Sequence, residues 1–413
     1  MSEKPSPPDS AAETTGDRAA ARTAPVSLRR HLLKETPLIL LVSLLTLSLW
    51  FSGCLQRQEH AVLDLNQYLK KQIWPAQVKK VTIVKITNDE YYDPKLFDGR
   101  CPLDPERLKV LIGAIALGTP ALIAVAIDTR HRDFSRLQPD PNWPPIVWAQ
   151  HLKAAPLLDC ENGQAIPEPI LADQNLTPSP LRGLNIFPED HDRTIRHYFR
   201  SCRTEYGPRP LFPAAVAAAW RQLEAGRPPQ SLIQSDLKPD EAELDFLLDT
   251  TFDHQIIKAR QVFEAAGSGW RDDGPLNQRI VLLGGEYDER SPKTSLKGRS
   301  LVELIADAIE GELQEKLIRP VKWWALALSL PVAGYLTAIL RFHLYGTRRR
   351  IVIWPAIPVI AMAISLVAFG RLHLSFDFVP VMTAVQLHQP LNRGWRFLRN
   401  QFNRWPGNRQ RPA

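Results

Sequence analysis

Acidic residues and paired glycines stand at the ends of three apolar segments that have the composition of buried strands. They are Asp89, Glu90, Asp128, Gly284, Gly285 and Asp288. Ligands of open α/β sheets bind at the carboxyl ends of the strands, so we predict that these residues border a ligand-binding surface. Structural roles stay open for each of them: the acids can cap turns or lie in solvent, and the glycines can permit a backbone turn that side chains would block.

The cluster Glu286, Asp288 and Glu289 raises the question of a cation site, since close carboxylates repel one another. No coordinating pattern surrounds them, so we expect neither a metal ion nor another cofactor. The sequence also contains no nucleophile elbow, zinc-protease helix, phosphate-binding loop or kinase signature. We therefore expect the chain not to be an enzyme.

Two pairs of residues are predicted to stabilise the fold. Asp192 and Arg196 are expected to form a structural ion pair that closes a hairpin between the segments GLNIF and IRHYFRS. The four cysteines, at positions 54, 101, 160 and 202, match no zinc motif and allow three full disulfide pairings. We favour a disulfide between Cys160 and Cys202.

The elements that must position these residues alternate between strands and helices. Strand patterns occupy residues 81–87, 120–128, 144–150, 242–249 and 279–285, and helix patterns occupy residues 102–118, 211–226, 255–266 and 300–313. A strand, a helix and a strand at this spacing form a βαβ unit with parallel strands. We predict an α/β fold with a mixed, largely parallel sheet and helices on its faces, and a loop at residues 88–94.

Apolar segments on either side of this domain have the length and composition of membrane spans. One precedes it, at 37–55, and three follow it, at 323–340, 351–369 and 372–387. We therefore divide the chain into a disordered tail (1–36), a first span (37–55), a domain (56–320), three spans (321–390) and a basic tail (391–413).

Arginine clusters set the expected orientation of these spans. The loop containing Arg348, Arg349 and Arg350 and the tail beginning near Arg393 should be cytoplasmic, and four spans then place both termini inside. The domain would be periplasmic, on a multi-pass protein of the bacterial inner membrane. The net charge of +7 is concentrated beside apolar spans, so we expect the partner to be the lipid bilayer and not nucleic acid.

Four segments, in order, resemble the second CHASE family of bacterial extracellular sensory domains associated with cyclases and histidine kinases. The first is VTIVKITNDE, in which Lys85 replaces a usual acid, and the second is ALIAVAID, which ends in Asp128. The third, GLNIFPEDHDRTIR, has Arg193 in place of Gly but keeps Gly183, Asn185, Asp190, Asp192 and Arg196. The fourth is a closing block that keeps Gly284, Gly285, Asp288, Gly298 and Ala306. One span before the domain and three after it also match the family.

The resemblance implies a membrane-anchored sensor module that responds to an unknown extracellular ligand. The cytoplasmic pieces are too short for a catalytic domain, so the signal should pass to a separate signalling partner in the membrane or cytoplasm. The sequence leaves open whether the protein forms a homodimer. Two alternatives are a membrane scaffold subunit that binds protein partners and an extracytoplasmic hydrolase that uses the acidic loops.

Overall fold

The computed structural model of the protein describes residues 28–129, 131, 133–134, 137–150, 181–190, 192, 194–204, 207–229, 245–270, 274–287, 293–294, 299–343 and 347–404. The chain forms two compact units. The α/β unit contains Gly53–Leu326 and Pro358–Val379, and the helical unit contains Met1–Ser52, Ala327–Ile357 and Pro380–Ala413. The α/β unit thus includes the ends of helices that the sequence analysis assigned to membrane spans.

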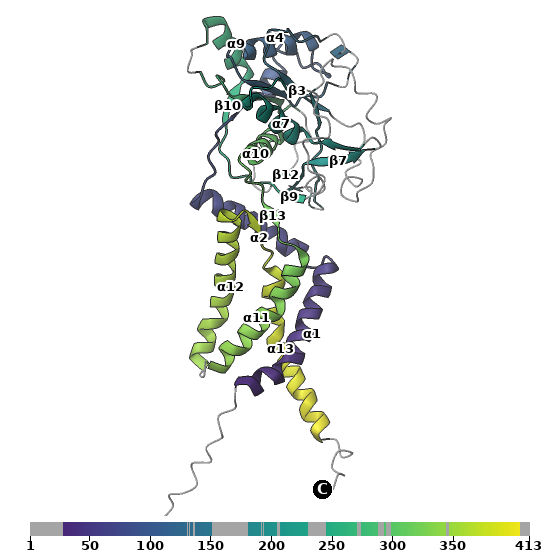
Figure 1. Ribbon diagram of the computed structural model, residues 1–413, viewed down its shortest axis with the longest axis vertical. Helices are drawn as coiled ribbons and strands as arrows, with labels where there is room; N and C mark the ends of the chain where they lie inside the picture. The colour runs from purple at the N-terminus through teal and green to yellow at the C-terminus, as the bar shows by residue number, and fades with distance from the viewer. Residues whose placement is uncertain are drawn as a thin grey trace, which may run out of the picture. The chain divides into compact units, whose positions relative to one another are not determined.

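A six-stranded parallel sheet forms the centre of the α/β unit (Figure 1), with the strand order β10–β1–β11–β2–β3–β4. The strands are β1 (Val81–Ile86), β2 (Leu122–Val125), β3 (Ile146–Gln150), β4 (Arg182–Leu184), β10 (Gln255–Lys258) and β11 (Ile280–Gly285). The inner strands are mostly apolar because both of their faces are covered. The predicted α/β fold with a largely parallel sheet is therefore confirmed.

Helices cover both faces of this sheet. Alternate residues of β1 point in opposite directions: Val81 and Ile83 pack with α7 (Phe212–Glu224) and α10 (Leu301–Leu313), whereas Val84 and Ile86 pack with α4 (Pro105–Ala116) and α9 (Ala259–Ser268). The chain passes from β1 through α4 to β2, and β11 lies between these two strands. The first and last strands of the main sheet are therefore direct neighbours within it.

Among the described residues, four short strand pairs lie outside the main sheet. They are β5 (Thr194–Ile195) with β12 (Lys293–Thr294), β6 (His197–Phe199) with β9 (Asp245–Leu247), β7 (Ser201–Thr204) with β8 (Gly207–Pro210), and β13 (Arg319–Pro320) with β14 (Leu374–Ser375).

The hairpin predicted between GLNIF and IRHYFRS is wrong. Its first arm is β4, which continues the main sheet beside β3, and part of its second arm is β6, which pairs with β9. Gly183 explains the placement of β4, because a Cβ atom there would lie 2.5 Å from the Cα atom of Phe212. The glycine lets β4 lie directly against the start of α7.

Two other local predictions need correction. Residues 88–94 are not simply a loop, because Asn88–Tyr91 forms the short helix α3. Thr87 and Glu90 cap the start of this helix with a capping box. The helix predicted from Gln255 begins four residues later, at Ala259, because Gln255–Lys258 forms the edge strand β10. Ile256 and Ile257 in this stretch favour a strand, since their branched side chains restrict helical rotamers.

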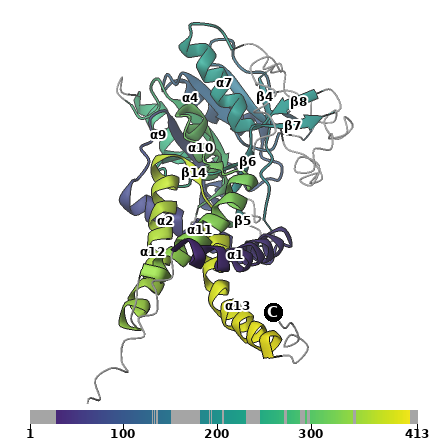
Figure 2. The ribbon, with the colours of Figure 1, turned by 60° about the horizontal axis from the view of Figure 1, so that its bottom comes forward.

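The amphipathic helix α2 (Gln56–Ile73), which the sequence analysis did not predict, belongs to the α/β unit. Figure 1 and Figure 2 show it beside the carboxyl-terminal part of α12 (Thr347–Arg371). The two helices are in contact there: Asn66 donates a hydrogen bond to Ser365 at 3.1 Å, and the ring of Trp74, the residue after α2, fills the space above Gly370.

The helical unit contains α1 (Leu28–Phe51), most of α11 (Trp323–His343), the start of α12 and most of α13 (Val379–Arg404). Leu38 and Val42 of α1 pack with Leu330 of α11 and Ala384 of α13. A hydrogen bond from Tyr335 to Thr36, at 3.1 Å, adds a polar link between α11 and α1. These contacts hold three helices together as a small bundle.

Among the described residues, two helices are long and apolar enough to cross a membrane: Leu28–Phe51 and Trp323–Leu340. Val359–Arg371 is a shorter apolar helix. The span predicted at 372–387 is wrong in its position, because Leu374–Ser375 is a strand and α13 begins only at Val379. Asp377 lies before this helix, where its carboxylate accepts a hydrogen bond from the backbone of Val379.

The close packing at Gly183 can be tested by substitution. We expect Gly183→Ala to lower the free energy of unfolding by about 1–3 kcal/mol, because the added methyl group would meet backbone atoms. Gly267→Ala is the matched control: no atom lies within 4 Å of its Cβ position on α9, so it should stabilise by about 0.5–1 kcal/mol. Denaturant unfolding of the full chain in detergent would measure both, and equal effects would contradict this interpretation.

Candidate functional site

Glu90, one of the predicted ligand-binding residues at the carboxyl end of β1, has a structural role. Its side chain is buried, and one carboxylate oxygen accepts hydrogen bonds from the backbone and hydroxyl of Thr87, both at 2.9 Å. The other oxygen accepts a hydrogen bond from the backbone N–H of Arg260, at the start of α9. Glu90 therefore caps the starts of α3 and α9. It stabilises both helices by accepting hydrogen bonds from backbone N–H groups that have no partner within the helix.

Gly284 and Gly285 also serve packing instead of the predicted turn. Both lie within β11, paired with Lys85 and Ile86 of β1. A Cβ atom on Gly284 would lie 2.4 Å from a methyl carbon of Val302, and one on Gly285 would lie 2.0 Å from the ring of Tyr287. The glycines thus let α10 and Tyr287 approach the sheet. The expected turn is wrong at these positions.

Two of the predicted acids at this edge, Asp89 and Asp128, retain some exposure. Asp89 is exposed in α3, and Asp128 is half-buried three residues beyond β2. Lys85, in β1, forms an ion pair with Glu286 at 2.8 Å, and its Nζ atom lies 3.9 Å from the carboxylate of Glu303 in α10. Asp288 lies outside the described residues. The described edge therefore presents charged groups, most of which are engaged with one another.

The structure gathers a second set of charged residues around Arg196, which lies between β5 and β6. Its guanidinium donates five hydrogen bonds of 2.7–3.0 Å: two to Asp64 of α2, one to Asp190 and two to Asp192. A guanidinium has five N–H donors, so every donor is used. We call these four residues the Arg196 network. It contains the Asp192–Arg196 ion pair, at 3.0 Å, without the predicted hairpin.

Electrostatics favour the charged forms within the Arg196 network. Hydrogen bonds from Arg196 hold the pKa of Asp192 well below its usual value. Burial opposes the charge on Arg196, yet its hydrogen bonds to the three aspartates raise its pKa. Three carboxylates face one guanidinium, so acidic groups outnumber basic ones in the network.

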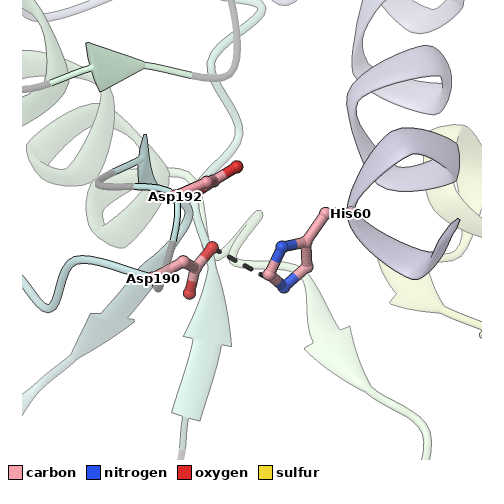
Figure 3. Close-up of side chains that lie close together, drawn as sticks. All are labelled: His60, Asp190 and Asp192. Atoms are coloured by element: carbon pink, nitrogen blue, oxygen red, sulfur yellow. Dashed lines mark ion pairs between the residues drawn. The ribbon is translucent and has the colours of Figure 1, made fainter. Parts of the chain in front are cut away.

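Histidines lie next to this excess of negative charge. Figure 3 shows His60, from α2, directed toward Asp190, with 3.8 Å between its Nε2 and the carboxylate. His197 approaches Asp190 as well, at 3.6 Å. Possible ligand atoms of His60, Asp190 and Asp192 all lie within 4.8 Å of one another, so these residues could hold a divalent cation. Such an ion would compete with Arg196, which already binds both carboxylates, and we therefore assign an ionic junction between α2 and the domain.

A buried polar contact continues this junction along α2. Lys70 donates a hydrogen bond to Asp249 at 2.6 Å, and both side chains are almost fully buried. Gln67 donates to the backbone oxygen of Leu248, and Asn66 donates to Ser365 of α12. These residues, Asn66, Gln67 and Lys70, form what we call the α2 polar face. It joins α2 both to the sheet domain and to the end of α12.

A third buried charge cluster lies at α10. His254 is hydrogen-bonded to Asp307 through Nε2 at 2.9 Å, and Arg299 contacts the same carboxylate and the backbone oxygen of Phe252. Burial raises the pKa of Asp307. The His254 and Asp307 side chains are almost fully buried and Arg299 shares the carboxylate, so the cluster resembles a structural clamp more than a catalytic dyad.

The cysteines divide into two classes. Cys54 and Cys101 are exposed and form no disulfide bond, whereas Cys202 is disulfide-bonded. Cys160, the partner favoured from the sequence, lies outside the described residues.

The residues that sequence reasoning missed are mainly those of α2 and their partners: His60, Asp64, Lys70, His197 and Asp249. A helical-period reading of HAVLDLNQYLKKQI would have found the helix. It would not have found the contacts, since Asp64 and Arg196 are 132 positions apart and Lys70 and Asp249 are 179 apart.

In comparisons with known proteins, no family model matches the chain, and no curated protein or solved structure is significantly similar to it. The resemblance to a sensory family therefore rests on the four sequence segments alone. Evidence on function therefore comes from the geometry of the described residues.

The importance of the Arg196 network can be tested by removing its cation. Arg196→Met should lower the free energy of unfolding by about 3–5 kcal/mol, because three carboxylates lose their shared partner. The matched control is Arg100→Met, which removes a pair with Asp98 that is largely exposed, and should cost about 0–1 kcal/mol. Denaturant unfolding of both variants decides the matter, and similar losses would refute a central role for Arg196.

The lowered pKa of Asp192 predicts a specific pH dependence. A depressed folded-state pKa stabilises the protein at pH values above the unfolded-state pKa of about 4, and this contribution is lost as pH falls toward the folded-state pKa. Asp192→Asn should therefore lower Tm at about pH 6, and the difference from the unmodified protein should shrink as pH falls below about 4. A pH-independent difference in Tm would show that charge at Asp192 is not involved.

Proposed function

We propose that the chain is a membrane-anchored sensor module of bacterial signal transduction, with a domain of the second CHASE type. Four spans would hold it in the inner membrane, with the domain in the periplasm and both termini in the cytoplasm. The two described helices of sufficient length and hydropathy support membrane attachment. The ordered segments of the resemblance fall on β1, on β2 and its following residues, on the β4–β6 region and on β11–α10.

The observation that carries this proposal is the double attachment of α2. The helix follows the first apolar helix by four residues, and its polar face joins both the domain, at Asp249, and the end of α12, at Ser365. A change in the domain that moved Asp249 would therefore act through α2 on α12, the start of which belongs to the helical unit. Coupling of this kind lets ligand binding bias a two-state arrangement of membrane helices.

The ligand surface we favour is the carboxyl edge of the parallel sheet, where Asp89 and Asp128 are at least partly exposed. Glu90, Gly284 and Gly285 would shape this edge without touching the ligand. The chain would not be an enzyme, and its signal would reach a partner protein through the membrane helices or the basic α13. A scaffold role, with a protein in place of a small ligand, is the alternative.

The orientation is tested with single cysteines in a background that lacks Cys54 and Cys101. A membrane-impermeant maleimide added to spheroplasts should label Val110→Cys, on exposed α4, and should label Arg349→Cys only after lysis. Equal labelling at both positions in intact spheroplasts would end the proposed topology.

Sensing itself is tested by ligand screening of the full chain in detergent against metabolites and cations. A true ligand should raise Tm, and a ligand present at about 100 times its Kd should stabilise by about 2.7 kcal/mol. Hydrogen exchange of α2 should change upon binding if the α2 polar face transmits the signal. Asp128→Asn should weaken the shift, whereas Glu224→Gln, at an exposed pair with Lys80, should not. A shift that leaves α2 exchange unaltered would argue against transmission through this helix.

A further inference from the structure

The helix α2 has an unusual distribution of side chains. Its buried side includes the polar residues Asn66, Gln67 and Lys70, whereas Leu65 and Tyr68 are 40% and 55% exposed. Ala61, Leu65 and Tyr68 are four and three positions apart, so they share one face of the helix. A surface helix of a soluble domain normally has the opposite arrangement, with apolar residues buried and polar residues exposed. Exposed Gln58 and Gln72 lie on the same face, so this face suits a boundary between apolar and polar surroundings.

The position of α2 along α12 identifies that environment. Within the α/β unit, α2 contacts α12 at Ser365, and its Lys70 lies over the ring of Phe369. Ser365 is six residues before the end of α12, which corresponds to about 9 Å along the helix axis. The headgroup region on each side of a bilayer is about 5–8 Å thick. If α12 crosses the membrane, α2 lies at the level where acyl chains meet headgroups.

Side chains near the same level agree with this depth. Trp323 and Trp324, at the start of α11, are 61% and 52% exposed, as is typical of aromatic residues at a membrane interface. Exposed Arg57, at the start of α2, and exposed Arg371, at the end of α12, add positive charge. Basic side chains at this level suit lipid phosphate groups.

We propose that α2 is an interfacial helix whose Ala61–Leu65–Tyr68 face contacts the lipid of the outer surface of the membrane. The inference rests on the proposed function, since it requires that the apolar helices span the bilayer. The α2 polar face then holds the domain while the opposite face touches lipid. The helix would make the domain responsive to the lipid surface as well as to a ligand.

Spin labels in nanodiscs of phosphatidylethanolamine and phosphatidylglycerol test the proposal. Tyr68→Cys and Leu65→Cys are made separately in the full chain lacking Cys54 and Cys101, neither of which forms a disulfide bond. Leu328→Cys, an exposed position in α11, serves as the membrane reference, and Val110→Cys, exposed on α4, serves as the aqueous reference. Collision rates with oxygen, which enters lipid, are compared with those of a water-soluble nickel chelate.

The ratio of oxygen to nickel collisions at Tyr68 and Leu65 should be several-fold higher than at Val110 and lower than at Leu328. A ratio equal to that of Val110 would overturn the inference, because α2 would then face water. Low collision rates with both reagents would overturn it too, since protein would then cover the face. A water-like ratio at Leu328 would instead refute the membrane span and with it the proposed function.

Discussion

Burial of charge on α2 is the constraint on which the arrangement of the α/β unit depends. Lys70 and Asp249 are almost fully removed from water, and Arg196 is 3% exposed while it binds three aspartates. A buried ion without its partner costs several kcal/mol, so these residues can be buried only when α2, the loop at Asp190 and the segment at Asp249 are all in place. Apolar packing tolerates small shifts, whereas these contacts require one geometry.

The same kind of polar contact also joins the domain to the helices that follow it. The contact from Asn66 to Ser365 continues to the backbone oxygen of Phe376, so one polar chain passes from α2 through α12 to the segment before α13. The sheet, by contrast, is held by apolar residues on both faces and has no need of α2 for its own core. The unit thus combines a self-sufficient sheet with a polar attachment that depends on partners far away in the sequence.

The sequence predicted the sheet well because its strands are continuous apolar runs, a local property that is visible in VTIVKI or RIVLLG. It predicted α4 for a similar reason, since Asp104 and Pro105 mark the helix start. Gly284 and Gly285 were misinterpreted because a glycine that permits a turn and one that permits close packing look identical in sequence. Here Val302 and Tyr287, which decide between the two, occupy the space above them. The role of Glu90 was equally hidden, because Arg260 lies 170 positions away.

The short ladder between β13 and β14 has a mechanical consequence. Arg319 donates a backbone hydrogen bond to His373, and Val321 donates one to Ser375, so the segment that leads into α11 is joined to the segment that connects α12 with α13. Backbone ladders resist displacement along the strand axis, because a slip by one residue turns every side chain to the opposite face. Piston motion between these helix ends is therefore opposed, because it would break both hydrogen bonds.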